Sequence, residues 1–255
     1  IEGDYAIVGA YNKNSSTGAV YIFYRSGTSW TQQAKLTASN AGSGDEFGRA
    51  VGISGDYAFV GARREDTGGT DRGSVYIYVR SGTTWTQQAQ IQASDAQDSD
   101  SFGWALSVDG DYAIVGAYLE DTGGSNAGSV YIFYRSGTTW SQQAKIQASD
   151  KQADDRFGVS VDIKGEYAIV GADSEDTGGT DAGAAYIFKR TGTTWSQQSK
   201  LTASDAQADD KFGGYEQCVA ITSDYAVVGA NQEDAGGSNA GAAYVFSRSG
   251  STWTE

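Results

Sequence analysis

The sequence predicts an all-β protein: a β-propeller built from four-stranded antiparallel blades. Three observations predict it. A unit of about 55 residues recurs five times in the 255 residues, each unit carries tight X-Gly turns between short apolar runs, and no segment holds a helical apolar period. Glycine (35 residues) and aromatic residues (12%) are abundant, as strands and turns require. Because no linker or shift in composition divides the repeats, residues 1–255 are expected to form a single domain.

Each unit contains the same apolar strand, in which an acidic residue and a tyrosine precede Ala, an apolar residue and the triplet Val-Gly-Ala. The glycines of the five triplets are Gly9, Gly61, Gly116, Gly171 and Gly229. Each unit closes at a tryptophan, and these are Trp30, Trp85, Trp140, Trp195 and Trp253. Such apolar runs separated by Gly/Asp-rich loops predict antiparallel hairpins.

The third unit shows the order of its four strands. A first strand ends near Val108, an Asp-Gly turn leads into the second strand, and Val130–Phe133 forms the third strand after a long acidic loop. Trp140 begins the fourth strand, at the rim. The equivalent third strands are Val20–Phe23, Val75–Tyr78, Ala185–Phe188 and Ala243–Phe246.

The first and last blades are expected to be incomplete. Ile1–Ala10 matches a second strand, and Trp253–Glu255 begins a fourth strand without finishing it. Five units therefore have only four first strands. We expect five blades from this chain, with the joint between its ends either incomplete or made by further residues; a seven-bladed parent is the alternative.

The repeat resembles the FG-GAP family, whose blades form the head of integrin α-subunits. The resemblance rests on the Val-Gly-Ala triplets and on the pairs Phe47-Gly48, Phe102-Gly103, Phe157-Gly158 and Phe212-Gly213. It covers nearly the whole chain and implies a propeller that serves as an extracellular or cell-surface interaction or adhesion scaffold. The chain departs from the family in two ways. No proline follows any Gly-Ala, and two-residue turns replace the family's acidic calcium loop, which argues against calcium at that position.

The charge is expected to lie on one face. In a propeller, the loops between second and third strands and the crossovers between blades emerge on the same side, and most of the 32 acidic residues fall in them. The net charge of −14 disfavours nucleic acid and anionic membranes as partners, because both attract clustered Lys and Arg. Solubility explains the acidic face most simply; binding of a divalent cation or a cationic partner is the alternative.

The repeated Glu-Asp-Thr-Gly-Gly loops supply the candidate metal ligands, since carboxylates and flexible glycines suit Ca²⁺. The candidates are Glu120, Asp121, Asn126, Glu175, Asp176 and Asp181. We expect no tight calcium site and no other cofactor. The exposed Asn14-Ser15-Ser16 sequence is a candidate glycosylation site.

Composition and symmetry argue against an enzyme. The chain has no histidine, which excludes a Ser/His/Asp triad, and its polar residues repeat blade by blade instead of gathering unlike groups at one spot. No apolar run reaches the roughly 18–20 residues of a membrane span. We therefore expect a non-enzymatic scaffold that binds a protein or glycan ligand. The alternative is a carbohydrate-binding propeller whose repeated tryptophans stack on sugars, although these residues are equally explained by packing inside each blade.

Strand register predicts a repeated ion pair on the opposite face. If Ala117 lies opposite Ser129, then Asp111 lies opposite Arg135. The same register gives Asp4–Arg25, Asp56–Arg80, Glu166–Arg190 and Asp224–Arg248. Opposite charges paired across antiparallel strands stabilise by roughly 0.2–1 kcal/mol, and we expect at least three pairs to lie within about 4 Å. An anion-binding ring of arginines is the alternative.

Overall fold

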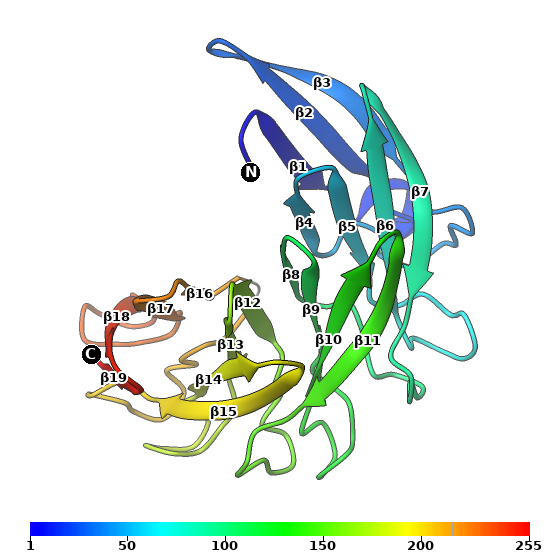
Figure 1. Cartoon of the computed structure of the whole chain (residues 1–255). Helices are drawn as coiled ribbons and strands as arrows, with labels where there is room; N and C mark the ends of the chain where they lie inside the picture. The colour runs from blue at the N-terminus through cyan, green and yellow to red at the C-terminus, as the bar shows by residue number, and fades with distance from the viewer. Residues whose placement is uncertain (216) are drawn as a thin grey trace.

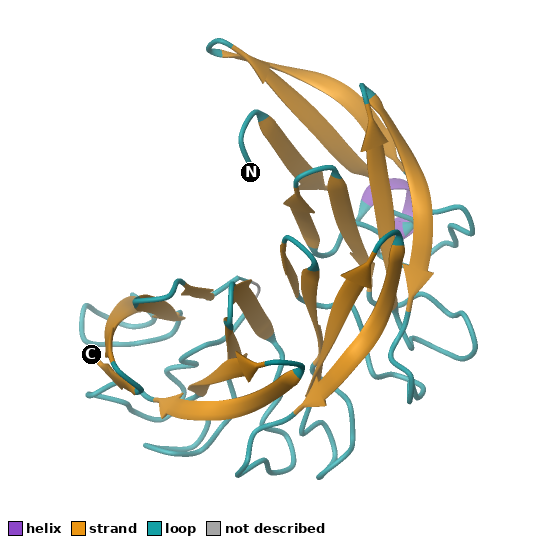
Figure 2. Cartoon of the chain, in the orientation of Figure 1, coloured by secondary structure: helices purple, strands orange, loops and turns teal. Residues whose placement is uncertain are grey.

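The computed structural model describes residues 1–215 and 217–255, which form five antiparallel sheets placed side by side in an open arc (Figure 1). We call each sheet a blade and number the blades along the chain. Strands make up almost all of the regular structure (Figure 2). The predicted all-β class and blade architecture are therefore confirmed. No helix in these two ranges is long and apolar enough to cross a bilayer.

Each blade is a meander whose strands follow one another in space as they do in sequence. The first blade contains β1 (Tyr5–Gly9), β2 (Val20–Ser26) and β3 (Ser29–Leu36). The second contains β4 (Val51–Ser54), β5 (Tyr57–Ala62), β6 (Ser74–Ser81) and β7 (Thr84–Ile91). The third contains β8 (Leu106–Asp109), β9 (Tyr112–Ala117), β10 (Ser129–Ser136) and β11 (Thr139–Ile146). The fourth contains β12 (Ser160–Lys164), β13 (Tyr167–Ala172), β14 (Ala184–Thr191) and β15 (Thr194–Leu201). The fifth contains β16 (Val219–Ile221), β17 (Tyr225–Ala230), β18 (Ala242–Ser249) and β19 (Thr252–Thr254).

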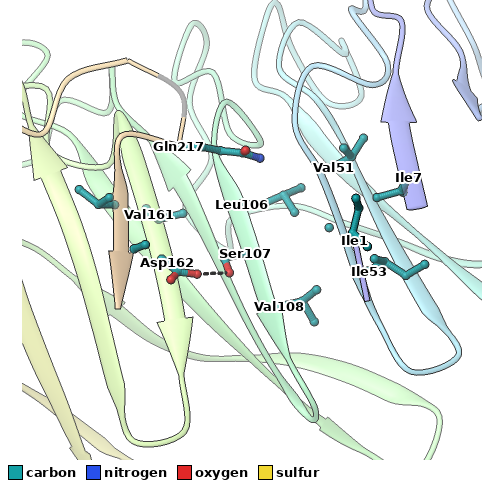
Figure 3. A pocket seen from close by; sticks show the side chains of 13 residues that line it. Ile1, Ile7, Val51, Ile53, Leu106, Ser107, Val108, Val161, Asp162 and Gln217 are labelled. Atoms are coloured by element: carbon teal, nitrogen blue, oxygen red, sulfur yellow. Dashed lines mark hydrogen bonds between the residues drawn. The ribbon is translucent and has the colours of Figure 1, made fainter. Parts of the chain in front are cut away.

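The short first strands β4, β8, β12 and β16 lie on the inner side of the arc, and the tryptophan-bearing strands lie at its rim (Figure 1). The first blade has three strands and lacks the inner one, as the strand count predicted. The inner strands surround a cavity of about 320 Å³ (Figure 3). Most of the residues that line it are apolar, although polar atoms make up much of its exposed wall. Its carboxylate, Asp162, accepts hydrogen bonds from Ser107 Oγ (2.7 Å) and the Ile221 N–H (2.9 Å).

Every internal blade buries both faces of its second strand. In the third blade, Ile114 and Val115 point to opposite sides and both are fully buried. Ile114 packs in a cluster with Val170 of the fourth blade, and Val115 packs in another with Phe59 of the second blade. This explains why two apolar residues are adjacent in a strand that would otherwise alternate.

The Val-Gly-Ala triplet of one blade contacts the Phe-Gly pair of the next blade at the joint between them. A Cβ at Gly116 would lie 2.1 Å from the carbonyl oxygen of Gly158, so only glycine allows the two backbones to approach this closely. The same approach joins Gly9 to Gly48, Gly61 to Gly103 and Gly171 to Gly213. The Phe-Gly pair of one blade therefore rests on the Val-Gly-Ala triplet of the blade before it.

The loop of the first blade contains α1 (Lys13–Ser16), a single turn in which Asn14 (φ 53°) and Ser15 (φ 56°) adopt left-handed backbone angles. Asn14, the candidate glycosylation residue, is exposed there. The fifth unit has three extra residues in its sequence, at 214–216, and Glu216 lies outside the described residues.

Candidate functional site

The acidic loop of each blade and the crossover that follows it form one continuous surface. After the third blade, the Asp154 N–H donates to the Ser125 carbonyl (2.7 Å), the Arg156 N–H to Asn126 (3.1 Å) and the Phe157 N–H to Ala127 (3.0 Å). These bonds place the loop between second and third strands beside the crossover, as propeller topology predicts. We call this surface the loop face.

Exposed carboxylates recur along the loop face. One aspartate stands at the same loop position in each of the second to fifth blades, and these are Asp66, Asp121, Asp176 and Asp234. The crossovers add Asp95, Asp98, Asp150, Asp154, Asp205 and Asp209, which are also exposed. The loop face is therefore a strongly negative surface.

The candidate metal ligands Asp121 and Asp176 brace their own loops. Asp121 Oδ1 accepts the backbone N–H of Asn126 (2.8 Å), and Asp176 Oδ1 accepts that of Asp181 (2.9 Å). Asn126 and Asp181 both have left-handed φ, near 50°. The Asn126 side chain donates to Asp154 instead (2.9 Å), and Asp181 pairs with Lys211 (3.1 Å).

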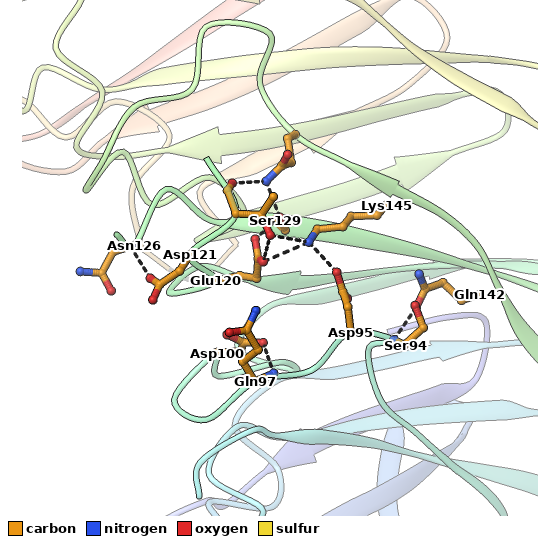
Figure 4. A network of polar contacts seen from close by, with 12 residues as sticks. Ser94, Asp95, Gln97, Asp100, Glu120, Asp121, Asn126, Ser129, Gln142 and Lys145 are labelled. Atoms are coloured by element: carbon orange, nitrogen blue, oxygen red, sulfur yellow. Dashed lines mark hydrogen bonds and ion pairs between the residues drawn. The ribbon is translucent and has the colours of Figure 1, made fainter. Parts of the chain in front are cut away.

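The candidate ligand Glu120 is fully buried at the centre of a polar network (Figure 4). It accepts hydrogen bonds from Ser129 Oγ (2.6 Å), Thr122 Oγ1 and Lys145 Nζ (3.0 Å), and Lys145 also contacts Asp95 (2.7 Å). Burial alone would raise the pKa of Glu120, but the bonds from Ser129, Thr122 and Lys145 outweigh it and lower that pKa. The carboxylate is therefore held ionised by its donors.

The same network recurs in the fourth blade with the same residue types, and in the second blade with neutral amides in place of the lysine and the aspartate. In the fourth blade, Lys200 Nζ contacts Glu175 (2.8 Å) and Asp150 (2.7 Å). In the second blade, Gln90 replaces the lysine and Asn40 replaces the aspartate, and the amide of Asn40 donates to Glu65 (2.8 Å). The second blade thus has neutral amides where the third has one cation and one anion. The net charge around the buried glutamate is therefore the same in both blades.

The structure does not gather the six candidate metal residues into one coordination sphere. Within the described ranges, no three His, Cys, Asp or Glu side chains come together as ligands would. Glu120 and Glu175 face lysines in the interior, whereas Asp121 and Asp176 face backbone amides at the surface. The expectation that calcium binds at most weakly stays a prediction.

A buried aspartate closes each crossover by accepting a backbone N–H three residues before it, and these are Asp45, Asp100, Asp155 and Asp210. Asp100 is 2% exposed and accepts the Gln97 N–H (2.7 Å), and Asp155 is 3% exposed and accepts the Gln152 N–H (2.6 Å). Burial raises the pKa of each to about 6, partly opposed by that backbone hydrogen bond. These raised pKa values could not be predicted from the sequence, because the burial of the two carboxyls depends on the folded crossover.

The loop face departs from the repeat at its inner end, where one cluster was missed by the sequence analysis. Trp104 packs against Tyr118 with the two rings tilted by 45° (centroids 4.5 Å apart), and the guanidinium of Arg63 lies 4.8 Å from the Trp104 ring. Glu46 binds Arg63 through two hydrogen bonds (2.6 and 2.9 Å) and lies 3.4 Å from Arg64. The available signal was that Trp104 is the one tryptophan outside the repeated position.

On the opposite face, the predicted register is observed: Ala117 pairs with Ser129. Four of the five acid–arginine pairs are in contact. Asp4–Arg25 (2.8 Å), Asp224–Arg248 (3.1 Å), Asp56–Arg80 and Asp111–Arg135 form ion pairs.

The fifth pair, Glu166–Arg190, meets only through the backbone, so that part of the prediction is wrong. Arg190 donates to the Gly192 carbonyl (3.2 Å) and lies 4.4 Å from the Tyr112 ring, which fixes its guanidinium as in the other blades. The longer Glu166 side chain stays exposed instead of meeting it. Because internal arginines stack on tyrosines of the preceding blade, they brace the joints and do not form an anion-binding ring.

The repeated tryptophans serve the blade joints. Trp85, Trp140, Trp195 and Trp253 are 7–8% exposed, and each packs edge-on against a tyrosine of the preceding blade. The indole N–H of Trp85 donates to Gln33 (3.0 Å), and that of Trp195 donates to Gln143 (3.1 Å). These four rings offer no free stacking surface, which weighs against the carbohydrate-binding alternative in the second to fifth blades. Trp30 of the first blade is 40% exposed.

The repeated Gln-Gln pair also links blades, a role that the sequence analysis missed. In the third blade the register shifts between Ile132 and Phe133, which places Gln143 in a β-bulge. The other glutamine, Gln142, accepts the backbone N–H of Ser94 in the preceding crossover (2.9 Å). The two glutamines therefore bind different neighbours: Gln142 binds the preceding crossover and Gln143 binds the tryptophan of the next blade. In the sequence, the only sign of this role is that the Gln-Gln pair recurs just after each repeated tryptophan.

Comparison with protein families assigns the repeat. The FG-GAP repeat family matches residues 30–78, 85–133, 140–188 and 195–246, which together cover most of the chain. The protein therefore belongs to the FG-GAP repeat family, and the resemblance noted in the sequence is confirmed. No curated protein matched the chain.

Proposed function

We propose that this chain is a non-enzymatic interaction scaffold of the cell surface or extracellular space, whose loop face binds a protein with a basic surface. The observation that supports this most is the row Asp66, Asp121, Asp176 and Asp234. These residues are exposed at the same position in four successive blades, and within the described residues none of them has an ion-pair partner. A row of like charges steers and orients a partner of the opposite charge.

Membership of the FG-GAP family supports the extracellular setting, because these blades also build the integrin α-subunit head. A non-enzymatic role is supported by the way polar groups are used. The buried carboxylates Glu120 and Glu175 bind internal donors, and the network repeats from blade to blade instead of assembling unlike groups at one place.

The test neutralises the row without disturbing the loops. Replacing Asp66, Asp121, Asp176 and Asp234 by Asn keeps an oxygen that accepts the loop N–H. A control variant, Glu166→Gln with Asp224→Asn, removes two negative charges from the opposite face, and a second variant, Asp121→Asn with Asp176→Asn, removes two from the row for direct comparison. Partners captured from the native source by the wild type and by the control, in a salt-sensitive manner, are expected to be lost by the four-Asn variant. Equal capture by all of these proteins would contradict the proposal.

We also propose that the loop face works without a tight calcium site, since the candidate ligands already bind lysines and backbone amides. Calcium at a hundredfold excess over a true dissociation constant would stabilise the fold by about 2.7 kcal/mol. We expect the melting temperature to change no more with Ca²⁺ than with Mg²⁺ at equal ionic strength. A saturable shift specific to Ca²⁺ would contradict this expectation.

A further inference from the structure

The residues at the inner end of the loop face differ from blade to blade. The position that follows each Val-Gly-Ala triplet holds, from the first blade to the fifth, Tyr11, Arg63, Tyr118, Asp173 and Asn231. Two residues further on, by contrast, a Glu-Asp pair recurs in the second to fifth blades. Because these blades share one fold, the fold does not dictate the variable residues. Their side chains are therefore available to a ligand that contacts several blades at once.

Trp104 forms a fixed platform at this place. It is 7% exposed, and its indole N–H donates to the Val159 carbonyl of the next blade (3.1 Å). The guanidiniums of Arg49 and Arg63 lie 4.2 and 4.8 Å from its ring. Such cation–π contacts position a guanidinium without neutralising its charge. The platform therefore fixes two guanidiniums at the inner end of a face rich in exposed aspartates.

Arg64 and Arg156 are the accessible arginines of this region, with side chains 49% and 42% exposed. Arg64 Nε lies 3.4 Å from Glu46, and Arg156 Nη1 lies 3.8 Å from the buried Asp173. Both distances exceed the roughly 2.7–2.9 Å of a charge-assisted hydrogen bond. Glu46 instead binds Arg63 with both oxygens (2.6 and 2.9 Å). Among the described residues, these three guanidiniums thus share two carboxylates, and the two accessible ones keep donors for a further oxygen.

Tyr118 shows that these positive charges converge. Its ring packs against Trp104, with the centroids 4.5 Å apart. Burial raises the pKa of Tyr118, and the charges of four arginines act in the opposite direction, namely Arg63, Arg156, Arg49 and Arg64. Charges influence a pKa only over short distances, because water and salt screen them. Cations from the second blade and from the crossover into the fourth blade are therefore close to one phenol of the third blade.

A hollow of about 190 Å³ adjoins the platform. Trp104, Leu106 and Val161 supply apolar parts of its lining, and Arg49 supplies a cation. These residues belong to the second, third and fourth blades, which have a neighbouring blade on each side. A cavity of about 150 Å³ is enough to hold benzene. The hollow can therefore take one small ring or a short apolar chain.

We propose that the inner end of the loop face binds a small organic carboxylate, whose oxygens accept hydrogen bonds from Arg64 and Arg156 and whose apolar body enters the hollow beside Trp104. A guanidinium matches a carboxylate through two parallel N–H···O bonds, and Arg63 already binds Glu46 in this way. This site goes beyond the proposed scaffold function, because its ligand has the opposite charge to a partner of the aspartate row. The exposed aspartates around it repel anions in general, so an anion bound here is held by the arginines.

Benzoate is the probe that tests the proposal, because it joins a carboxylate to an apolar ring, and benzamide is its uncharged counterpart. In a ligand-observed NMR titration of the wild type, we expect benzoate to bind with a Kd of about 1 mM and benzamide to bind at least about tenfold more weakly. Arg64→Gln with Arg156→Gln is expected to weaken benzoate binding about tenfold or more, since it removes two charge-assisted donors. Each single variant is expected to show part of this loss.

Arg72→Gln is the control, because Arg72 lies on the same face but pairs with Asp98 (2.9 Å). It is expected to bind benzoate like the wild type, and far-UV circular dichroism with melting temperature verifies that all variants are folded. No binding of benzoate by the wild type up to about 20 mM overturns the proposal. Equal affinity for benzoate and benzamide also overturns it, as does an unchanged affinity in the Arg64 and Arg156 variants. An equal loss in Arg72→Gln would overturn it too, since overall charge would then explain the binding.

Discussion

Neighbouring blades approach each other closely at Gly116 because glycine has no side chain. Gly116→Ala would place a Cβ 2.1 Å from the Gly158 carbonyl oxygen, so the fourth blade must shift. We expect a loss of about 1–3 kcal/mol in the free energy of unfolding, as for other overpacked sites. Urea titration followed by tryptophan fluorescence measures it.

The last blade offers a matched control for this substitution. Gly229 occupies the same strand position, but its nearest neighbour, Cys218, is 3.7 Å from an added Cβ. Gly229→Ala is therefore expected to be neutral or stabilising, because alanine loses less backbone entropy than glycine on folding. Equal losses at Gly116 and Gly229 would show that the blade joint is not the cause.

The buried Asp100 carboxyl should make stability depend on pH. Its pKa is raised to about 6 in the folded protein, above the unfolded value of about 4. Its stabilising contribution is therefore fully present below about pH 4 and is lost as the pH rises through about 6.

Asp100→Asn removes this loss while its amide oxygen still accepts the Gln97 N–H. The variant is expected to melt at a higher temperature than the wild type at pH 7 and to lose that advantage by pH 4. The exposed Asp209→Asn serves as the control and is expected to show no such trend. A difference for Asp100→Asn that does not change with pH would argue that Asp100 is solvated.

The polar network that links strands β10 and β11 to the preceding crossover can be tested with the composition of another blade. Lys145→Gln leaves Glu120 and Asp95 without their shared cation, and we expect it to cost about 1.5–3 kcal/mol. Adding Asp95→Asn recreates the Gln90 and Asn40 pair of the second blade. The double variant is therefore expected to be more stable than Lys145→Gln alone.

A double-mutant cycle by urea unfolding, with Asp95→Asn as the second single variant, isolates this coupling. If the cost of the double variant equals the sum of the two single costs, the residues do not act as one network.

The sequence predicted strands better than it predicted contacts between blades. Strand order and register follow from local pattern, which is why pairing Ala117 with Ser129 located four of the ion pairs. The Glu120–Lys145–Asp95 network and the Gln-Gln bridges join residues that are distant in the chain, so the recurrence of these residues marks them as important without showing which partners they contact. The predicted Glu166–Arg190 ion pair is not formed although its backbone register is correct. Register determines where the two backbones lie, but not where the longer glutamate side chain points.

The whole molecule is an arc of blades. Neighbouring blades cover both faces of each internal blade but only one face of each terminal blade. The count of repeated strands in the sequence predicted that the first blade has no inner strand, because the first unit contains no residues that match one. The sequence did not predict which residues the two ends expose, since this depends on which face of each blade its neighbour covers. Val8 and Tyr225 were recognisable as repeat residues, yet only the structure shows them uncovered.

Hydrogen–deuterium exchange, measured by mass spectrometry, tests most directly that blade joints hold this fold together. Local protection follows local packing and hydrogen bonding. The amides of β9 and β13, which are covered on both faces, are expected to exchange most slowly, and those of β1 and β17, which are covered on one face, distinctly faster. Equal protection of all four strands, or greater protection of β1 and β17, would contradict an open arc stabilised by its joints.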